Sequence, residues 1–169
     1  MANFKEISPY EVASNPFELI GKDWALLTAK NGDGCNTMTA SWGGVGIMWN
    51  KPVTFAFVRP QRFTFGLIED EEYFSMSFYP EEYRKALTFC GTKSGRNVDK
   101  VKECGFTPIF DEKAPYFAEA KLVFICRKLY AQDLNKDSVI DENTVLPQYK
   151  GNDYHKMYIS EIVKVLKND

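Results

Sequence analysis

Residues 36–42 carry three small hydroxyl side chains on a predicted strand. Side chains alternate between the two faces of a strand, so the hydroxyl groups share one face and the intervening apolar groups share the other. Together with the glycine-rich run that follows, these donors could bind the polar edge of a flat heteroaromatic ring. A solvent-facing strand edge is the alternative interpretation. The candidate residues of this segment are Asn36, Thr37, Met38, Thr39, Ala40, Ser41 and Trp42.

Two arginines lie close to the predicted start of a helix. Arg59 ends a predicted strand, and Arg62 falls in the first turn of a helix that we expect from residue 60 to about residue 68. Free backbone N–H groups at a helix start attract anions, and a guanidinium group can bind a phosphate through two parallel hydrogen bonds. The segment therefore predicts an anion site, with solvated arginines as the alternative. Its candidate residues are Arg59, Gln61, Arg62, Phe63 and Thr64.

A basic loop that contains glycine occupies residues 91–100. It lacks the spacing of the phosphate-binding loop of nucleoside triphosphatases, and a predicted helix precedes it where that motif needs a strand, so we exclude this class of enzyme. The loop remains suited to binding a phosphate at the start of the next helix. A solvated connection between two helices is the alternative. The candidate residues are Ser94, Gly95, Arg96 and Lys100.

His155 is the only histidine of the chain and begins a predicted strand. With one histidine, and with four cysteines that form no C-x-x-C pair, the sequence predicts no metal site. A hydrolase triad would have to use His155, and no G-x-S-x-G segment accompanies it. A hydrogen-bonded structural role and a role in a binding site both stay open for this residue. We name no catalytic acid or base.

The composition predicts one packed domain over residues 1–169. Aromatic residues make up 15% of the chain and charged residues 26%, which argues against disorder. The net charge of -2 argues against a nucleic-acid partner. No run approaches the ~18 apolar residues of a membrane span, and the first nine residues lack the apolar segment of a signal peptide. We therefore expect a cytoplasmic protein that binds neither nucleic acid nor membrane.

Strands dominate the predicted secondary structure. We expect strands at residues 24–30, 36–42, 53–59, 73–79, 120–132 and 155–166, the fifth being apolar on both faces, with a hairpin turn at 31–34. Short helices are expected at 60–68, 80–90 and 98–104, the last two ending at Gly91 and Gly105. Strands and helices do not alternate regularly. The predicted fold class is therefore mainly β, a β-barrel with peripheral helices.

Four of these segments, taken in order, resemble the flavin reductase-like family, the FMN-binding split β-barrels that include the flavoredoxins. The matching segments are residues 36–42, 58–64, 94–100 and 155–163. The resemblance extends over the chain from about residue 24 to residue 166. Ser160 stands where the family pattern has glycine, and we expect its side chain to alter the floor of the pocket.

The resemblance implies non-covalent FMN in a groove at the interface of a homodimer, held by a Greek-key-like split barrel. Residues 37–42 would line the isoalloxazine ring. Arg59, Arg62 and Thr64 would contact the phosphate and ribityl end, with residues 94–96 nearby from the same subunit or from its partner. His155 matches the histidine of the family's final strand.

Three functions stay open on this basis. The first is an NAD(P)H-dependent flavin reductase that passes electrons to free flavin, a metal ion or a protein acceptor. The second is a flavoredoxin-type electron-transfer protein without efficient NAD(P)H turnover. The third is chemistry like that of pyridoxamine-phosphate oxidase on a related barrel, which the matching segments fit less well. In the first two, the flavin carries the chemistry, and backbone amides with the hydroxyls of Thr39 and Ser41 are the expected donors to its ring.

Overall fold

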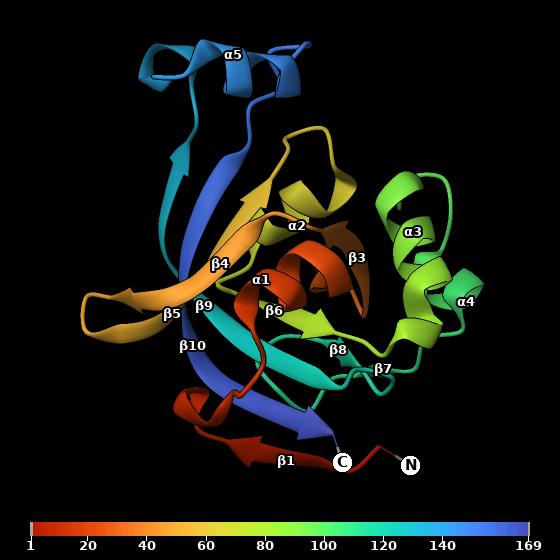
Figure 1. Ribbon diagram of the computed structural model, residues 1–169. Coiled ribbons are helices and arrows are strands. Elements are labelled where there is room, and N and C mark those ends of the chain that lie inside the picture. Colours follow the sequence, from red (N-terminus) through yellow and green to blue (C-terminus); the bar gives the residue numbers. More distant parts are fainter. Residues whose placement is uncertain (1, 169) are drawn as a thin grey trace.

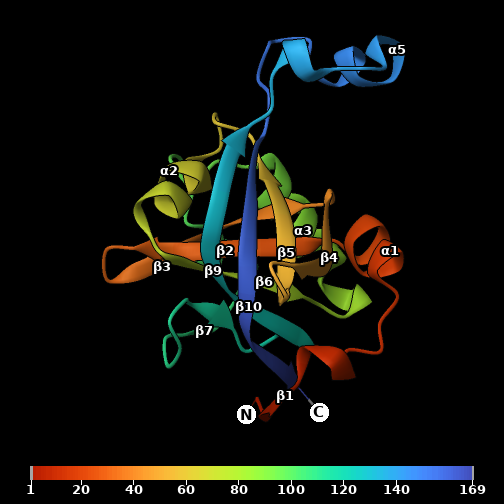
Figure 2. The ribbon, with the colours of Figure 1, turned by 90° about the vertical axis from the view of Figure 1, so that its left-hand side faces the viewer.

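A computed structural model describes residues 2–168. Eight strands form one antiparallel sheet in the order β3-β2-β6-β9-β10-β5-β4, and β1 pairs with the far end of β10. Figures 1 and 2 show this sheet curling around a core. The strands are β1 (Phe4–Ile7), β2 (Ala25–Asn31), β3 (Gly34–Ala40), β4 (Gly43–Met48), β5 (Lys51–Val58), β6 (Tyr73–Phe78), β9 (Leu122–Asp133) and β10 (Lys156–Asn168). A separate two-stranded ribbon joins β7 (Pro108–Ile109) and β8 (Tyr116–Phe117).

Short helices surround the sheet. The α-helices are α1 (Pro16–Glu18), α2 (Phe63–Asp70), α3 (Arg84–Thr92), α4 (Lys100–Cys104) and α5 (Glu142–Val145), with a π-helical turn at Leu19–Asp23 and 3-10 turns at Pro9–Glu11, Glu81–Tyr83, Lys136–Ser138 and Leu146–Gln148. The mainly β fold class is confirmed. Among residues 2–168, no helix is both long and apolar enough to span a membrane.

Local sequence explains most of the boundaries. The predicted hairpin turn is confirmed: β2 and β3 pair from Asn31 with Gly34, and Gly32 has the positive φ of 58° that such a turn needs. Gly105, at φ 67°, ends α4 as predicted. The predicted cap at Gly91 is wrong, because this residue lies inside α3. An added Cβ would come within 3.3 Å of the Thr39 side chain, so Gly91 instead allows α3 to pack closely on β3.

Two hydrophobic clusters hold the layers together. Inside the barrel, alternate residues of β2 and β9, such as Leu27 and Phe124, meet β6 and β10. On the outer face, Val123 and Ile125 of β9 meet α3 and the loops around β8, with Leu87 and Cys90 as the buried side chains of α3. Both faces of β9 are buried over residues 122–126, within the stretch that its sequence predicts to be apolar on both faces, while residues 130–133 are exposed. The outer cluster fixes α3 and α4 beside β3, and so fixes the basic loop between them.

Residues 134–155 form a long excursion between β9 and β10, which we call the arm. Figures 1 and 2 show the arm, with α5, projecting beyond the barrel on extensions of these two strands. Among its residues only Tyr149 and His155 are buried. The arm is absent from both hydrophobic clusters, so its position depends on contacts made near its base.

Candidate functional site

Two adjoining cavities form a groove beside β3 and the start of α2. The larger has a volume of about 530 Å³ and the smaller about 210 Å³, and Met38, Arg59 and Arg62 line both. Together they fall in the size range of ligand sites. The larger, the basic cavity, is lined by Met38, Arg59, Gln61, Arg62, Phe63, Thr64, Thr92, Lys93, Ser94 and Lys100. The smaller, the aromatic cavity, is lined by Met38, Thr39, Ala40, Ser41, Trp42, Phe57, Arg59, Arg62 and His155.

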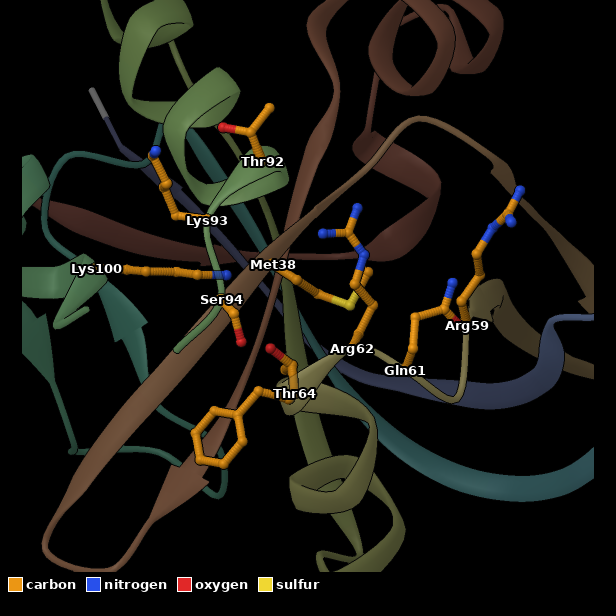
Figure 3. A pocket seen from close by; sticks show the side chains of 10 residues that line it. Met38, Arg59, Gln61, Arg62, Thr64, Thr92, Lys93, Ser94 and Lys100 are labelled. Carbon is orange, nitrogen blue, oxygen red and sulfur yellow. The ribbon is translucent and has the colours of Figure 1, made fainter. Parts of the chain in front are cut away.

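The loop before α4 lies close to β3 and α2 because residue 95 is glycine. An added Cβ on Gly95 would lie 2.3 Å from Asn36 Oδ1 and 2.7 Å from Phe63 Cδ1. Asn36 Nδ2 in turn donates to Thr64 Oγ1 at 2.7 Å. In Figure 3 the hydroxyl groups of Thr64 and Ser94 point toward each other. Three separate segments of the chain therefore converge on one hydroxyl-lined wall.

Lys100 is a buried lysine whose ammonium group borders the basic cavity. Its side chain is 3% exposed, and Nζ donates to the carbonyl oxygens of Thr37 and Cys90 at 2.8 Å each. Burial lowers the pKa of this ammonium group. An ammonium has three N–H donors, so one remains for a ligand. Figure 3 shows Nζ pointing toward Met38 and Ser94.

The two arginines of the predicted anion site take different directions. Arg62 Nη1 donates to the Gly91 carbonyl at the C-terminal end of α3 at 2.6 Å, and burial, then Arg59, lowers the pKa of its guanidinium. Arg59 turns toward the arm, where Nη1 pairs with Asp153 and Nη2 donates to the Gln148 carbonyl at 2.9 Å. In Figure 3, Arg59 points away from Ser94 and Lys100. Arg62 therefore lies nearer to the anion-binding groups than Arg59 does.

His155 forms part of the wall of the aromatic cavity and is 8% exposed. Its Nδ1 lies 2.9 Å from the Tyr149 hydroxyl, and its ring centroid is 5.0 Å from that of Trp42. Burial, and then the charge of Arg59, lowers the pKa of His155 to about 4. The imidazole is therefore neutral at pH 7.

The sequence matches one protein family over most of its length. The family described as "Flavin reductase like domain" matches residues 18–169. The chain belongs to the flavin reductase-like family. A search of curated proteins found no match to the sequence.

Solved structures of this family share the fold. A flavoredoxin from Methanosarcina acetivorans has a TM-score of 0.68 at 22% identity, over 85% of this chain and 67% of that one. The FMN-binding domain of a flavin reductases-like enzyme from Shewanella baltica OS155 has a TM-score of 0.70 at 16% identity, over 99% and 78%. A putative flavin reductase with a split barrel domain, from Shewanella frigidimarina, has a TM-score of 0.66 at 17% identity, over 92% and 73%. The predicted split barrel is confirmed.

Most of the candidate residues meet in the groove, but four do not line it. Thr37 is fully buried, and its hydroxyl donates to the Leu27 carbonyl at 3.1 Å. Asn36 and Gly95 act behind the wall through the contacts described above. Arg96 donates to the Gln61 carbonyl at 3.0 Å, and its guanidinium lies 5.4 Å from the centre of the Phe63 ring. These four residues can shape the groove without touching a ligand.

The structure changes the expected role of the hydroxyl face of β3. This face lies beneath α3, and Thr39 Oγ1 donates its proton to the Leu87 carbonyl. The Thr37 carbonyl instead points outward, since it accepts from Lys100. Alternate residues of an antiparallel edge strand direct their backbone groups to the same side, so the Thr39 N–H also faces outward. Backbone donors of β3, rather than its threonine hydroxyls, are thus available at the groove.

Ser160 does not form the floor of the groove. It is fully buried in β10, between Thr54 of β5 and Lys128 of β9, and lines neither cavity. Three further residues line the groove without having been predicted from the sequence, Phe57, Thr92 and Lys93. Lys93 lies in the basic loop, and its positive charge could have identified it as a candidate anion ligand. Phe57 and Thr92 reach the groove through the packing of β5 and α3.

The groove has donors that suit a phosphorylated ring compound. Four cationic residues line the basic cavity, Arg59, Arg62, Lys93 and Lys100, although the Arg59 guanidinium turns away to Asp153, and no carboxylate lines the cavity. Hydroxyl groups and a buried ammonium with a free N–H suit a phosphate. The aromatic cavity adds a neutral imidazole and an indole, which suit a planar ring.

Proposed function

We propose that this chain binds FMN without a covalent bond, with the phosphate in the basic cavity and the ring in the aromatic cavity. The observation that carries the proposal is the junction of the two cavities at Met38 and Arg62. A cation-lined end and an aromatic end are continuous, as a phosphorylated ring compound requires. Membership of the flavin reductase-like family supports the same ligand.

At the phosphate end, Lys100, Ser94 and Thr64 are the proposed direct contacts. Lys100 presents a charge-assisted donor from a buried position, and such bonds are about twice as strong as neutral ones. Arg62 adds a second charge, held in place by the Gly91 carbonyl. Gly95 and Asn36 set the position of this wall from behind.

At the ring end, the chain supplies position and polarity. Bound FMN would supply the transfer of hydride and electrons. The Thr39 backbone N–H can donate to the polar edge of the ring, and Trp42 with His155 can exclude water from one side. The neutral His155 places no positive charge there. No residue of the groove has to gain or lose a proton for this task.

We further propose that the protein is an oxidoreductase that takes hydride from NADH or NADPH and passes electrons to free flavin, a metal ion or a protein. A flavoredoxin-type carrier is the second candidate, and the flavoredoxin of similar fold favours it. The two share the groove and differ in whether a nicotinamide can reach the ring. Anaerobic mixing with each nucleotide tests this.

A reductase should bleach its flavin at a rate compatible with turnover, about 1–1000 per second for typical enzymes. Bleaching slower than about one per minute, with dithionite still effective, would favour the carrier. The spectrum before mixing and the mass of the acid-extracted cofactor test FMN itself. FAD or pyridoxal phosphate in that extract would contradict the proposal.

A homodimer is the proposed assembly. Large apolar side chains stay exposed on the single chain, among them Phe17 at 85%, Ile47 at 60% and Trp49 at 51%. Exposed apolar surface of this kind favours association, and symmetric pairs are the commonest form.

A further inference from the structure

The arm has no part in either hydrophobic cluster, and its side-chain contacts with the barrel lie near its base. Of residues 134–155, only Tyr149 and His155 are buried, while Ile140 near α5 is 98% exposed. A hollow of about 610 Å³ is lined almost entirely by residues of the arm itself, with Trp42 as the one lining residue from the barrel. The contacts near Tyr149 therefore decide where the arm lies.

Asp153 is the centre of this attachment. Its carboxylate pairs with Arg59 Nη1 and accepts from Gln61 Nε2 at 2.7 Å. The same guanidinium donates to the Gln148 carbonyl and lies 5.3 Å from the centre of the Tyr149 ring. The ion pair between Asp153 and Arg59 thus joins the connection between β5 and α2 to both sides of Tyr149 in the arm, at Gln148 and at Asp153.

The segment held by Asp153 carries one wall of the aromatic cavity. Tyr149 bonds to His155 through its hydroxyl, and the His155 ring contacts Trp42. His155 and Trp42 both line that cavity. A shift of residues 149–155 would therefore move the wall of the proposed ring site, while Lys100, Ser94 and Thr64 would stay in place on the other side of Met38.

We propose that Asp153 is a positioning residue that holds the arm against Arg59 and Gln61 and so sets the width of the ring end of the groove. The effect on ligand binding rests on the proposed function, but the attachment of the arm by Asp153 does not. Asp153 acts through His155 and Tyr149 and touches no ligand itself. The sequence led us to expect that Arg59 binds the phosphate. In the structure Arg59 instead pairs with Asp153 and acts at the ring end of the groove.

Asp153→Asn removes the charge and keeps the size of the side chain. Asp137→Asn is the matched control, since it makes the same change on an exposed residue of the same arm. Hydrogen–deuterium exchange of the cofactor-free proteins should show faster exchange at residues 146–155 in Asp153→Asn and not in Asp137→Asn, with β9 and β10 unchanged. Arg59→Lys keeps the charge but loses the guanidinium that bonds to both Asp153 and Gln148, and it should also speed exchange at residues 146–155.

The second measurement compares FMN with riboflavin, which lacks the phosphate. If Asp153 acts on the ring end, Asp153→Asn weakens both ligands by the same factor, about two- to fivefold for a partly exposed ion pair. Weakening of FMN alone would place Asp153 at the phosphate end and overturn the proposal. So would tighter binding of FMN alone, because Asp153 would then compete with the phosphate for Arg59.

Two further results would also overturn it. Unchanged exchange in the arm would show that Asp153 does not hold it, and loss of protection throughout the barrel would make Asp153 a residue of the whole fold. If the wild-type chain binds neither FMN nor riboflavin, the proposed function fails. The exchange experiment then still decides the role of Asp153.

Discussion

Acid should destabilise the protein through His155, which is kept neutral inside the fold. Its pKa falls from 6.5 to about 4, because burial and the charge of Arg59 disfavour the imidazolium. The unfolded chain binds a proton near pH 6.5 and the folded chain does not, so stability rises with pH across this window. The contribution of the neutral His155 to the free energy of unfolding is fully present above pH 6.5, and it is lost as the pH falls toward 4.

The magnitude follows from the width of that window. At about 1.4 kcal/mol for each pH unit, the full effect would be about 3 kcal/mol. The ring borders an open cavity and Asp153 lies nearby, and both reduce the penalty, so we expect about 1–3 kcal/mol between pH 7 and pH 4.5. Tyr149, Arg59, Arg62 and Asp153 are the titratable groups around the ring.

Urea unfolding of the cofactor-free protein, followed by tryptophan fluorescence at several pH values, measures this. His155→Gln removes the titration and keeps a group that can bond to the Tyr149 hydroxyl. Carboxylates titrate in both proteins, so the difference between the two curves isolates His155. We expect the wild type to lose more stability than the variant between pH 6.5 and pH 4.5. Parallel curves would refute the argument that the imidazole is buried without charge.

Two other predictions concern the groove and the assembly. Gly95→Ala should destabilise the fold by about 1–3 kcal/mol and weaken FMN binding, because its Cβ would overlap Asn36 and Phe63. Gly66 lies within α2, and an added Cβ there would meet no atom within 4 Å, so Gly66→Ala should be neutral or stabilising by up to about 1 kcal/mol. Equal effects of the two substitutions on the melting temperature would contradict the close approach of Gly95 to Asn36 and Phe63. Sedimentation should show a dimer at micromolar concentration, and a monomer that retains FMN would contradict the proposed assembly.

The sequence predicted the parts of the fold that local rules control. Strand alternation placed β3 and β6, apolar runs placed β2 and β9, and the positive φ at Gly32 and Gly105 follows from glycine at turns and helix ends. Gly91 was misread because a glycine at a helix end and a glycine beneath a neighbouring strand look the same in one dimension. The helix expected from Pro60 begins only at Phe63, after a turn in which Arg62 N–H bonds to the Arg59 carbonyl.

The candidate site was predicted as a set of segments rather than as a geometry. The basic loop, Thr64 and His155 were found because their chemistry is visible in the residue types. The destination of Arg59 was not, since it depends on Asp153, 94 positions along the chain. The same holds for the hydroxyl face of β3, which α3 covers through contacts that no local pattern encodes.

Paired titrations with FMN and riboflavin test whether the basic cavity holds the phosphate of FMN. In Lys100→Met the preference for FMN over riboflavin should fall roughly 10- to 150-fold, the equivalent of a lost charged hydrogen bond of about 1.5–3 kcal/mol. Riboflavin affinity should stay near the wild-type value, which would show an intact groove. Lys102→Met, an exposed lysine of the same helix, should leave both affinities unchanged. An unaltered FMN preference in Lys100→Met would contradict the account.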